Sequence, residues 1–287
     1  MLQVPSWYGG GGRDYQLEAS CLTNTDTVER TGYDVYYPLS KSGNQMAANG
    51  MGWIIVDALD TLMIMNLTSR LSHAREWIST SLNYDQDQEV NTFETSIRML
   101  GGFLSAYYLS TTYPDMAPTA DDDHGAAGED LYLEKAADLA DRLLGAFDSG
   151  SGIPYASVNL KTLKGIPSHA DGGASSTAEA TSVQLEMKYL AMLTGEKNYW
   201  DKAEKVMQVV DDNGMEDGLL PIFLYADQGT FRGENIRLGS RGDSYYGTHG
   251  LPDREALITD NEQSISSSST CRLLRRNPYI LTCGIKR

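Results

Sequence analysis

The chain of 287 residues carries a formal net charge of −16, 41% hydrophobic residues and three cysteines without metal-ligand spacing. This acidic balance argues against nucleic acid and anionic membranes as partners, and the apolar content suffices for the core of one large domain. No apolar run reaches the roughly eighteen residues of a membrane-spanning helix, and the N-terminus lacks the pattern of a signal peptide. We therefore expect neither a membrane anchor nor a secretion signal in this chain.

Composition divides the chain into three segments. Residues 1–50 are rich in glycine and polar residues and predict an irregular N-terminal segment. Residues 51–246 carry recurring helical patterns and form the predicted domain. All 39 acidic residues lie at or before Glu262, and a serine-rich run follows. We therefore interpret residues 247–287 as an aberrant, disordered tail that does not belong to the fold.

Apolar residues recur at helical spacing in the middle segment. We predict helices over residues 52–67, 70–82, 91–110, 130–147, 177–194 and 198–212. Residues 153–160 and 219–225 have the β-branched and aromatic content of strands, and residues 229–231 are typical of a hairpin return. The acidic loop 115–130 fits no calcium-binding pattern and is interpreted as a surface insertion. The pattern as a whole indicates an all-α fold with short β-hairpins at the loop ends.

Residues 90–102 place a glutamate and an arginine one turn apart inside an apolar helical run. Phe93, Ile97 and Leu100 recur at three- and four-residue steps, which predicts a helix face turned towards a core. Glu94 and Arg98 fall together on a neighbouring stripe, within reach of each other. Because a buried carboxylate needs a partner, this pair is either a partly exposed helix salt bridge or part of an active site.

Other charged residues have weaker local signals. Glu179 lies near the start of a predicted helix, where the helix dipole alone is enough to favour a carboxylate. Arg241-Gly242-Asp243 precedes Ser-Tyr-Tyr, although the tripeptide by itself is also common in turns. Asp57 and Asp60 are interpreted as structural residues of the first predicted helix, with contact to a sugar as the alternative. His169 lies on a loop that is either a plain turn or the rim of a pocket.

Together with residues 52–67, these motifs resemble glycoside hydrolase family 47, the class I α1,2-mannosidases, from about Tyr33 to Tyr246. The motifs around Glu94 and Arg241 are the most specific, and they agree with the family in order and spacing. The resemblance implies an α/α toroid built of seven helical hairpins. Because the predicted helices make only about three hairpins, we expect this chain to carry roughly the first, N-terminal half of that barrel.

The resemblance also implies roles for individual residues. Glu94 corresponds to the general acid of an inverting glycosidase, and Asp243 corresponds to a second active-site carboxylate. Arg98 would orient Glu94, and Glu179 would bind the glycan. An arginine at position 241 is typical of the endoplasmic-reticulum type found in fungal members, and its guanidinium would select which branch of the glycan enters.

The activity implied by the resemblance is the hydrolysis of terminal α1,2-linked mannose on high-mannose N-glycans in the endoplasmic reticulum or secretory pathway. The resemblance also implies a calcium ion. Its threonine ligand, like the general base, belongs to the half of the barrel that we expect this chain to lack. No metal ligand is therefore assigned, and the chain alone is expected to be inactive. The alternative is a non-catalytic, lectin-like module that binds mannose in glycoprotein quality control.

Overall fold

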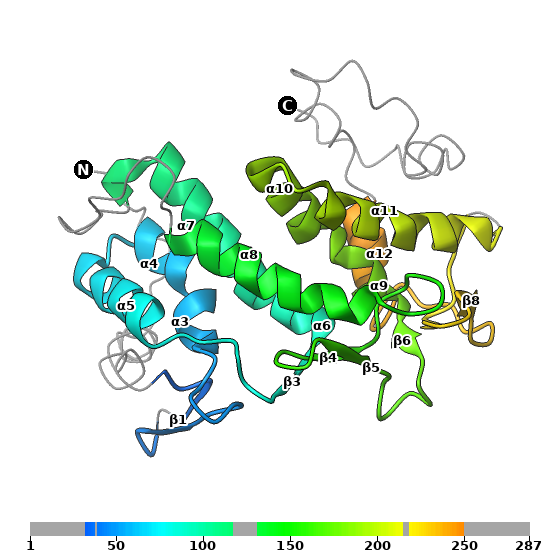
Figure 1. Ribbon diagram of the computed structural model, residues 1–287, viewed down its shortest axis with the longest axis horizontal. Coiled ribbons are helices and arrows are strands. Elements are labelled where there is room, and N and C mark those ends of the chain that lie inside the picture. The colour runs from blue at the N-terminus through cyan, green and yellow to red at the C-terminus, as the bar shows by residue number, and fades with distance from the viewer. Residues whose placement is uncertain (1–31, 38, 117–130, 215–217, 250–287) are drawn as a thin grey trace, which may run out of the picture.

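The computed structural model describes residues 32–37, 39–116, 131–214 and 218–249, and this part of the chain is mostly helical (Figure 1). The α-helices are α3 (Trp53–Asp57), α4 (Leu59–Ile64), α5 (Thr68–Thr80), α6 (Thr92–Glu94), α7 (Gly101–Thr112), α8 (Leu131–Leu143), α9 (Thr177–Ser182), α10 (Gln184–Thr194), α11 (Lys197–Asp212) and α12 (Asp243–His249). A π-helical segment, η1 (Thr95–Leu100), joins α6 to α7, and 3₁₀ turns η2 (Pro114–Met116) and η3 (Leu144–Phe147) follow α7 and α8.

Three of the predicted helices are confirmed as α5, α8 and α11 to within a few residues. The last four residues of the helix predicted over 130–147 form the 3₁₀ turn η3 instead. The other three predictions were too simple. The helix predicted over residues 52–67 is interrupted at Ala58, and the one over 177–194 is interrupted at Val183. The helix over 91–110 contains the π-helical segment η1. Neither glycine nor proline marks the interruptions at Ala58 and Val183, whereas the π-helical segment ends at Gly101.

The helices pack in succession along the chain. α7 lies between α4 and α8, α10 packs against α11, and α9 packs against α12. α8 turns one apolar face inwards, and Ala136, Leu139 and Leu143 on that face are fully buried. A side chain at Gly102 would place its Cβ 2.7 Å from the carbonyl oxygen of Val56, so glycine permits α7 to approach α3 closely. The buried side chains of all these helices form one continuous core.

Short strands gather along one edge of the helical body, the lower edge in Figure 1. They form three antiparallel sheets: β1 (Val35–Tyr37) with β2 (Ser42–Asn44), β3 (Glu89–Asn91) with β4 (Ser157–Asn159) and β5 (Lys164–Ile166), and β6 (Ser175–Ser176) with β7 (Phe223–Tyr225) and β8 (Thr230–Phe231). The predicted strands are present as the shorter β4 and β7, and the hairpin return is confirmed by pairing of Leu224 with Phe231. The prediction of an irregular segment up to residue 50 was wrong for the β1–β2 hairpin.

The second and third sheets have the same arrangement of strands and helix. In each, the first strand leads directly into a helix and pairs with a later strand, β3 with β4 and β6 with β7. The residue before each helix caps it, because Asn91 Oδ1 accepts a hydrogen bond from the amide of Glu94 and Ser176 Oγ accepts one from Glu179. Both glutamates therefore occupy the third position of their helix, at the edge of the body where the strands lie.

Two sequence-based predictions fall largely outside the described residues. The disordered tail predicted from residue 247 was placed too early, because α12 continues to His249. The rest of the predicted tail, and the acidic loop from residue 117 to 130, lie outside the described residues. Among the helices that the structure describes, none is both long and apolar enough to cross a membrane.

Candidate functional site

Glu94 and Arg98 form the ion pair that their spacing predicts. Arg98 Nε donates a hydrogen bond of 2.7 Å to Glu94 Oε2, and Arg98 Nη1 lies 3.4 Å from Asp57 Oδ2 at the end of α3. The hydrogen bond and charge of Glu94 raise the pKa of Arg98 above its usual value, so the guanidinium stays charged. The side chains of Glu94 and Arg98 are 40% and 44% exposed, so the pair is a partly exposed salt bridge.

Glu179 is the more enclosed glutamate, with 24% of its side chain exposed. Arg241 Nη1 donates to its Oε1 at 3.3 Å. Burial raises the pKa of Glu179 above its ordinary value. The nearby charge of Arg241 and the side-chain amide of Asn91 act in the opposite direction, but burial outweighs them.

Arg241 reaches this glutamate from a turn tied to the start of α9. Its backbone φ of +76° lies in the left-handed region, which is uncommon for a residue other than glycine. Its carbonyl oxygen accepts a hydrogen bond of 2.9 Å from the amide of Ala178, one of the amides that α9 itself leaves without a helical partner. Gly242 is required next to it, because a Cβ there would lie 2.3 Å from the carbonyl oxygen of Arg237.

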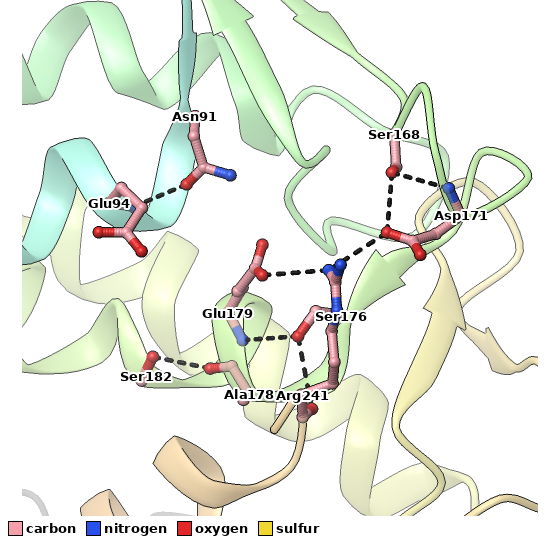
Figure 2. Close-up of polar contacts among 9 residues, drawn as sticks. All are labelled: Asn91, Glu94, Ser168, Asp171, Ser176, Ala178, Glu179, Ser182 and Arg241. Carbon is pink, nitrogen blue, oxygen red and sulfur yellow. Dashed lines mark hydrogen bonds and ion pairs between the residues drawn. The ribbon is translucent and has the colours of Figure 1, made fainter. Parts of the chain in front are cut away.

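Asn91 lies next to both charged clusters (Figure 2). Its Oδ1 accepts a hydrogen bond of 2.7 Å from the amide of Glu94. An open cavity of about 290 Å³ is lined by Asn91, Glu179 and Arg241 but not by Glu94. Five more of its lining residues are polar: Ser157, Ser168, His169, Asp171 and Ser176. Carboxylate, amide, hydroxyl and guanidinium groups of this kind are suited to a neutral ligand with many hydroxyl groups.

The structure thus places four of the five predicted site residues in two pairs, Arg98 with Glu94 and Arg241 with Glu179, and the helices of the two glutamates contact each other. Asp243 lies apart from them. It begins α12, its side chain is exposed, and its Oδ1 accepts a hydrogen bond of 2.9 Å from the amide of Ser244. Within the described residues its carboxylate has no hydrogen bond or ion pair with either cluster.

The loop between β5 and β6 forms one rim of the cavity. His169 on this loop lines the cavity, as one of the two sequence interpretations predicts, and its Nε2 lies 2.9 Å from Glu89 Oε1 on β3. Asp171 on the same loop was not singled out from the sequence, yet its Oδ2 lies 3.2 Å from Arg241 Nη1.

The sequence signals for the residues that were missed differ in strength. Asn91 stands three residues before Glu94, which is the spacing of a capping box. This spacing is a local signal that identifies Asn91 as a helix cap. No local pattern pairs Asp171 with a residue seventy positions later. That contact exists only because β6 and the turn before α12 meet in the fold.

The described residues contain no group of three or more histidine, cysteine, aspartate or glutamate side chains arranged to hold a metal ion. The clusters around Glu94 and Glu179 each include an arginine, which opposes binding of a cation. This part of the chain therefore does not fit a calcium site formed by acidic side chains.

Comparison with known proteins identifies the family of the chain. The family model for glycosyl hydrolase family 47 matches residues 29–267. This match extends past both ends of the range from Tyr33 to Tyr246 that the motifs indicate. A mannosyl-oligosaccharide 1,2-alpha-mannosidase of Candida albicans is 56% identical over 233 residues, which are 80% of this chain and 38% of that protein. An endoplasmic reticulum mannosyl-oligosaccharide 1,2-alpha-mannosidase of Saccharomyces cerevisiae is 46% identical over 75% of this chain and 40% of its own length.

Among solved structures, an alpha-1,2-mannosidase from Trichoderma reesei matches with a TM-score of 0.69 and 26% identity. The match covers 83% of this chain and 49% of that one. The chain thus spans about two fifths of the length of the curated relatives and half of the solved structure. Because the family model covers most of its length, the chain belongs to glycosyl hydrolase family 47.

Proposed function

We propose that this chain forms the acid-bearing part of an inverting α1,2-mannosidase that trims terminal α1,2-linked mannose from high-mannose N-glycans. The observation that carries the proposal is that Asn91, which caps the helix of Glu94, lines an open cavity together with Glu179 and Arg241. Family membership and the names of the relatives support the same substrate class. Their names also support a location in the endoplasmic reticulum.

The proposed roles follow from what inversion requires. One carboxyl group protonates the leaving oxygen, and a second carboxylate on the other face of the sugar activates water, with about 6.5–9.5 Å between them. Glu94 would supply the proton and Arg98 would orient it, since their hydrogen bond fixes the direction of the carboxyl group. Glu179 and Arg241 would hold sugar hydroxyls, and Asp243 would contribute the second active-site carboxylate of this half.

The proposed architecture is the first half of an α/α toroid. In support, α3–α4, α6–η1–α7 and α9–α10 pack against one another in turn, and each is followed by one helix that returns, α5, α8 or α11. The general base would then come from the part of the relatives' barrel that lies beyond the matched residues. We likewise assign any calcium ion to that part, and none of the roles proposed here depends on it.

A chimera tests the proposal. Residues 33–246 would replace the corresponding part of the Candida albicans relative, whose 56% identity favours correct packing. We expect this chimera to release β-mannose, the inverted product, from a nine-mannose glycan, as measured by NMR of the first product formed. Glu94→Gln should reduce its turnover about 10²–10⁴-fold, the usual effect of losing a general acid.

Glu234→Gln is the matched control, because Glu234 is exposed and belongs to neither charged pair. Turnover in the Glu94→Gln chimera equal to that of the control would contradict the acid role. A folded chimera that binds α1,2-mannobiose without hydrolysing any glycan would favour the lectin-like module instead.

A further inference from the structure

We propose that Asp171 is a positioning residue that fixes the orientation of the Arg241 guanidinium and thereby sets how the cavity holds a mannose unit. The proposal rests on the proposed function, because it assumes that Arg241 contacts the sugar. Asp171 would act through Arg241 and not by touching the reacting atoms. It belongs to the loop between β5 and β6, which the motifs around Glu94 and Arg241 do not include.

The first support is the set of contacts made by Arg241. Asp171 Oδ2 lies 3.2 Å and Glu179 Oε1 lies 3.3 Å from the same atom, Arg241 Nη1. The guanidinium carbon lies 5.5 Å from the centre of the Phe223 ring, within the range of a cation–π contact (Figure 2 shows the two ion pairs). Three groups from three different elements therefore hold one guanidinium.

This arrangement occupies only one of the three guanidinium nitrogens. Within the described part of the chain, Nε and Nη2 of Arg241 have no hydrogen-bond partner, and 36% of the side chain is exposed. Nε and Nη2 form an edge of the guanidinium that donates two parallel hydrogen bonds. The ion pairs to Nη1 thus leave that edge to a ligand, and two neighbouring sugar hydroxyls present acceptors of suitable spacing.

The second support is that Asp171 is itself held rigidly. Its side-chain oxygen Oδ2 accepts a hydrogen bond of 3.1 Å from Ser168 Oγ, and its backbone amide donates to the same hydroxyl oxygen. Its carbonyl oxygen accepts from the amide of Ala174 and from Arg232 Nη1. Only 18% of the Asp171 side chain is exposed.

Arg232 connects the loop back to the same aromatic ring. Its guanidinium carbon lies 5.8 Å from the centre of Phe223, so Phe223 contacts both arginines that bind Asp171. Arg232 donates to the backbone carbonyl oxygen of Asp171, and Arg241 forms an ion pair with its carboxylate. Of the two arginines, only Arg241 therefore needs the negative charge at position 171. Asp171→Asn removes this charge and leaves the backbone contact with Arg232 in place.

The experiment measures Arg241 directly in the 287-residue chain. Arginine side chains labelled with ¹⁵N would be followed by NMR, with Arg241→Lys identifying the Arg241 signals. Restricted rotation gives separate signals for the two Nη groups, and free rotation averages them. The affinity for α1,2-mannobiose would be measured by calorimetry in the same samples. The variants are Asp171→Asn, Asp171→Glu and Phe223→Leu.

We expect separate Nη signals in the unmodified chain and averaged signals in Asp171→Asn, with mannobiose affinity reduced about tenfold or more, as for loss of a charged hydrogen bond. Asp171→Glu, which restores the charge, should recover part of both effects. The control is Asp138→Asn, which breaks the 2.8 Å Arg142–Asp138 pair on α8. It should leave the Arg241 signals and the affinity unchanged.

Averaged Arg241 signals already present in the unmodified chain would overturn the proposal. So would an Asp171→Asn variant whose signals change while its affinity does not. If Asp171→Asn fails to fold, the Arg241 signals of Phe223→Leu and Asp171→Glu test the positioning role in its place. If the unmodified chain binds no mannobiose, the proposed function fails for this chain, and the guanidinium spectra by themselves then support or overturn the positioning role.

Discussion

Glu94 and Glu179 occupy the same position in two equivalent helices, yet their surroundings differ. Glu94 is 40% exposed and pairs with an arginine on its own helix, whereas Glu179 is 24% exposed and pairs with an arginine from a distant turn. Of the two pairs, only Glu94–Arg98 follows a local sequence rule, the spacing of one helical turn. The sequence therefore predicts the first pair from residue spacing. For the second, the family resemblance implies only that Glu179 and Arg241 each contact the glycan.

The raised pKa of Glu179 gives a prediction about stability and pH. A carboxyl whose pKa is higher in the folded than in the unfolded state stabilises the fold below the unfolded value, here near 4.5. That contribution is lost as the pH rises through the folded value. We therefore expect the stability of Glu179→Gln, relative to the unmodified chain, to increase between pH 4 and pH 7, as measured by urea unfolding.

The exposed Glu234→Gln serves as the control for this comparison, and its relative stability should stay nearly constant over the same range. A Glu179→Gln variant whose relative stability falls with rising pH would show that the Arg241 pair outweighs burial. In that case Glu179 would be bound mainly by charge, and the physical account of its pKa given above would be wrong.

At the scale of elements, the sequence predicts where helices start better than where they are interrupted. Asn91 and Ser176 each stand three residues before a glutamate, and each caps its helix as the capping pattern predicts. The interruptions at Ala58 and Val183 have helix-compatible backbone angles and ordinary helix-forming neighbours. They depend on how neighbouring helices pack, which periodicity along one segment does not report.

Ser176 gives the prediction for this scale. Its hydroxyl caps α9 through Glu179, and the residue is almost fully buried. Ser176→Ala should lower the free energy of unfolding by about 1 kcal/mol, the usual cost of losing a cap. Ser72→Ala is a suitable control, because that exposed serine on α5 bonds only a carbonyl one turn back. Equal losses in both variants, measured by urea unfolding, would argue against a capping role.

At the scale of the whole molecule, the main fact is that the chain spans about two fifths of its curated relatives. The sequence already indicated this, because its helical patterns account for about half of a seven-hairpin barrel. It did not indicate which surfaces would be left uncovered. The uncovered surfaces depend on how the helices face one another. The structure shows one such surface near the ends of α4, α7 and α10.

Large apolar side chains are exposed there. Ile64 and Met65 at the end of α4 are 65% and 52% exposed, Tyr108 on α7 is 45% exposed, and Met192 on α10 is 52% exposed. α7 packs against both α4 and α10, so these residues belong to neighbouring helices. Apolar side chains gathered on adjoining elements mark surfaces that other parts of a protein cover.

We therefore expect the combined variant Ile64→Ser, Tyr108→Ser and Met192→Ser to bind less of the dye 8-anilinonaphthalene-1-sulfonate than the unmodified chain, as measured by fluorescence. Its free energy of unfolding should fall by little, because exposed side chains away from specific contacts contribute within about 0.5 kcal/mol each. Leu39, which is 98% exposed on the β1–β2 hairpin, provides the control, since Leu39→Ser removes a single apolar side chain from another place. Equal dye binding by the combined variant and the Leu39 control would mean that the three side chains form no shared surface. A lower signal in the combined variant alone would place the uncovered surface at the ends of α4, α7 and α10, where the remaining part of a longer relative has room to pack.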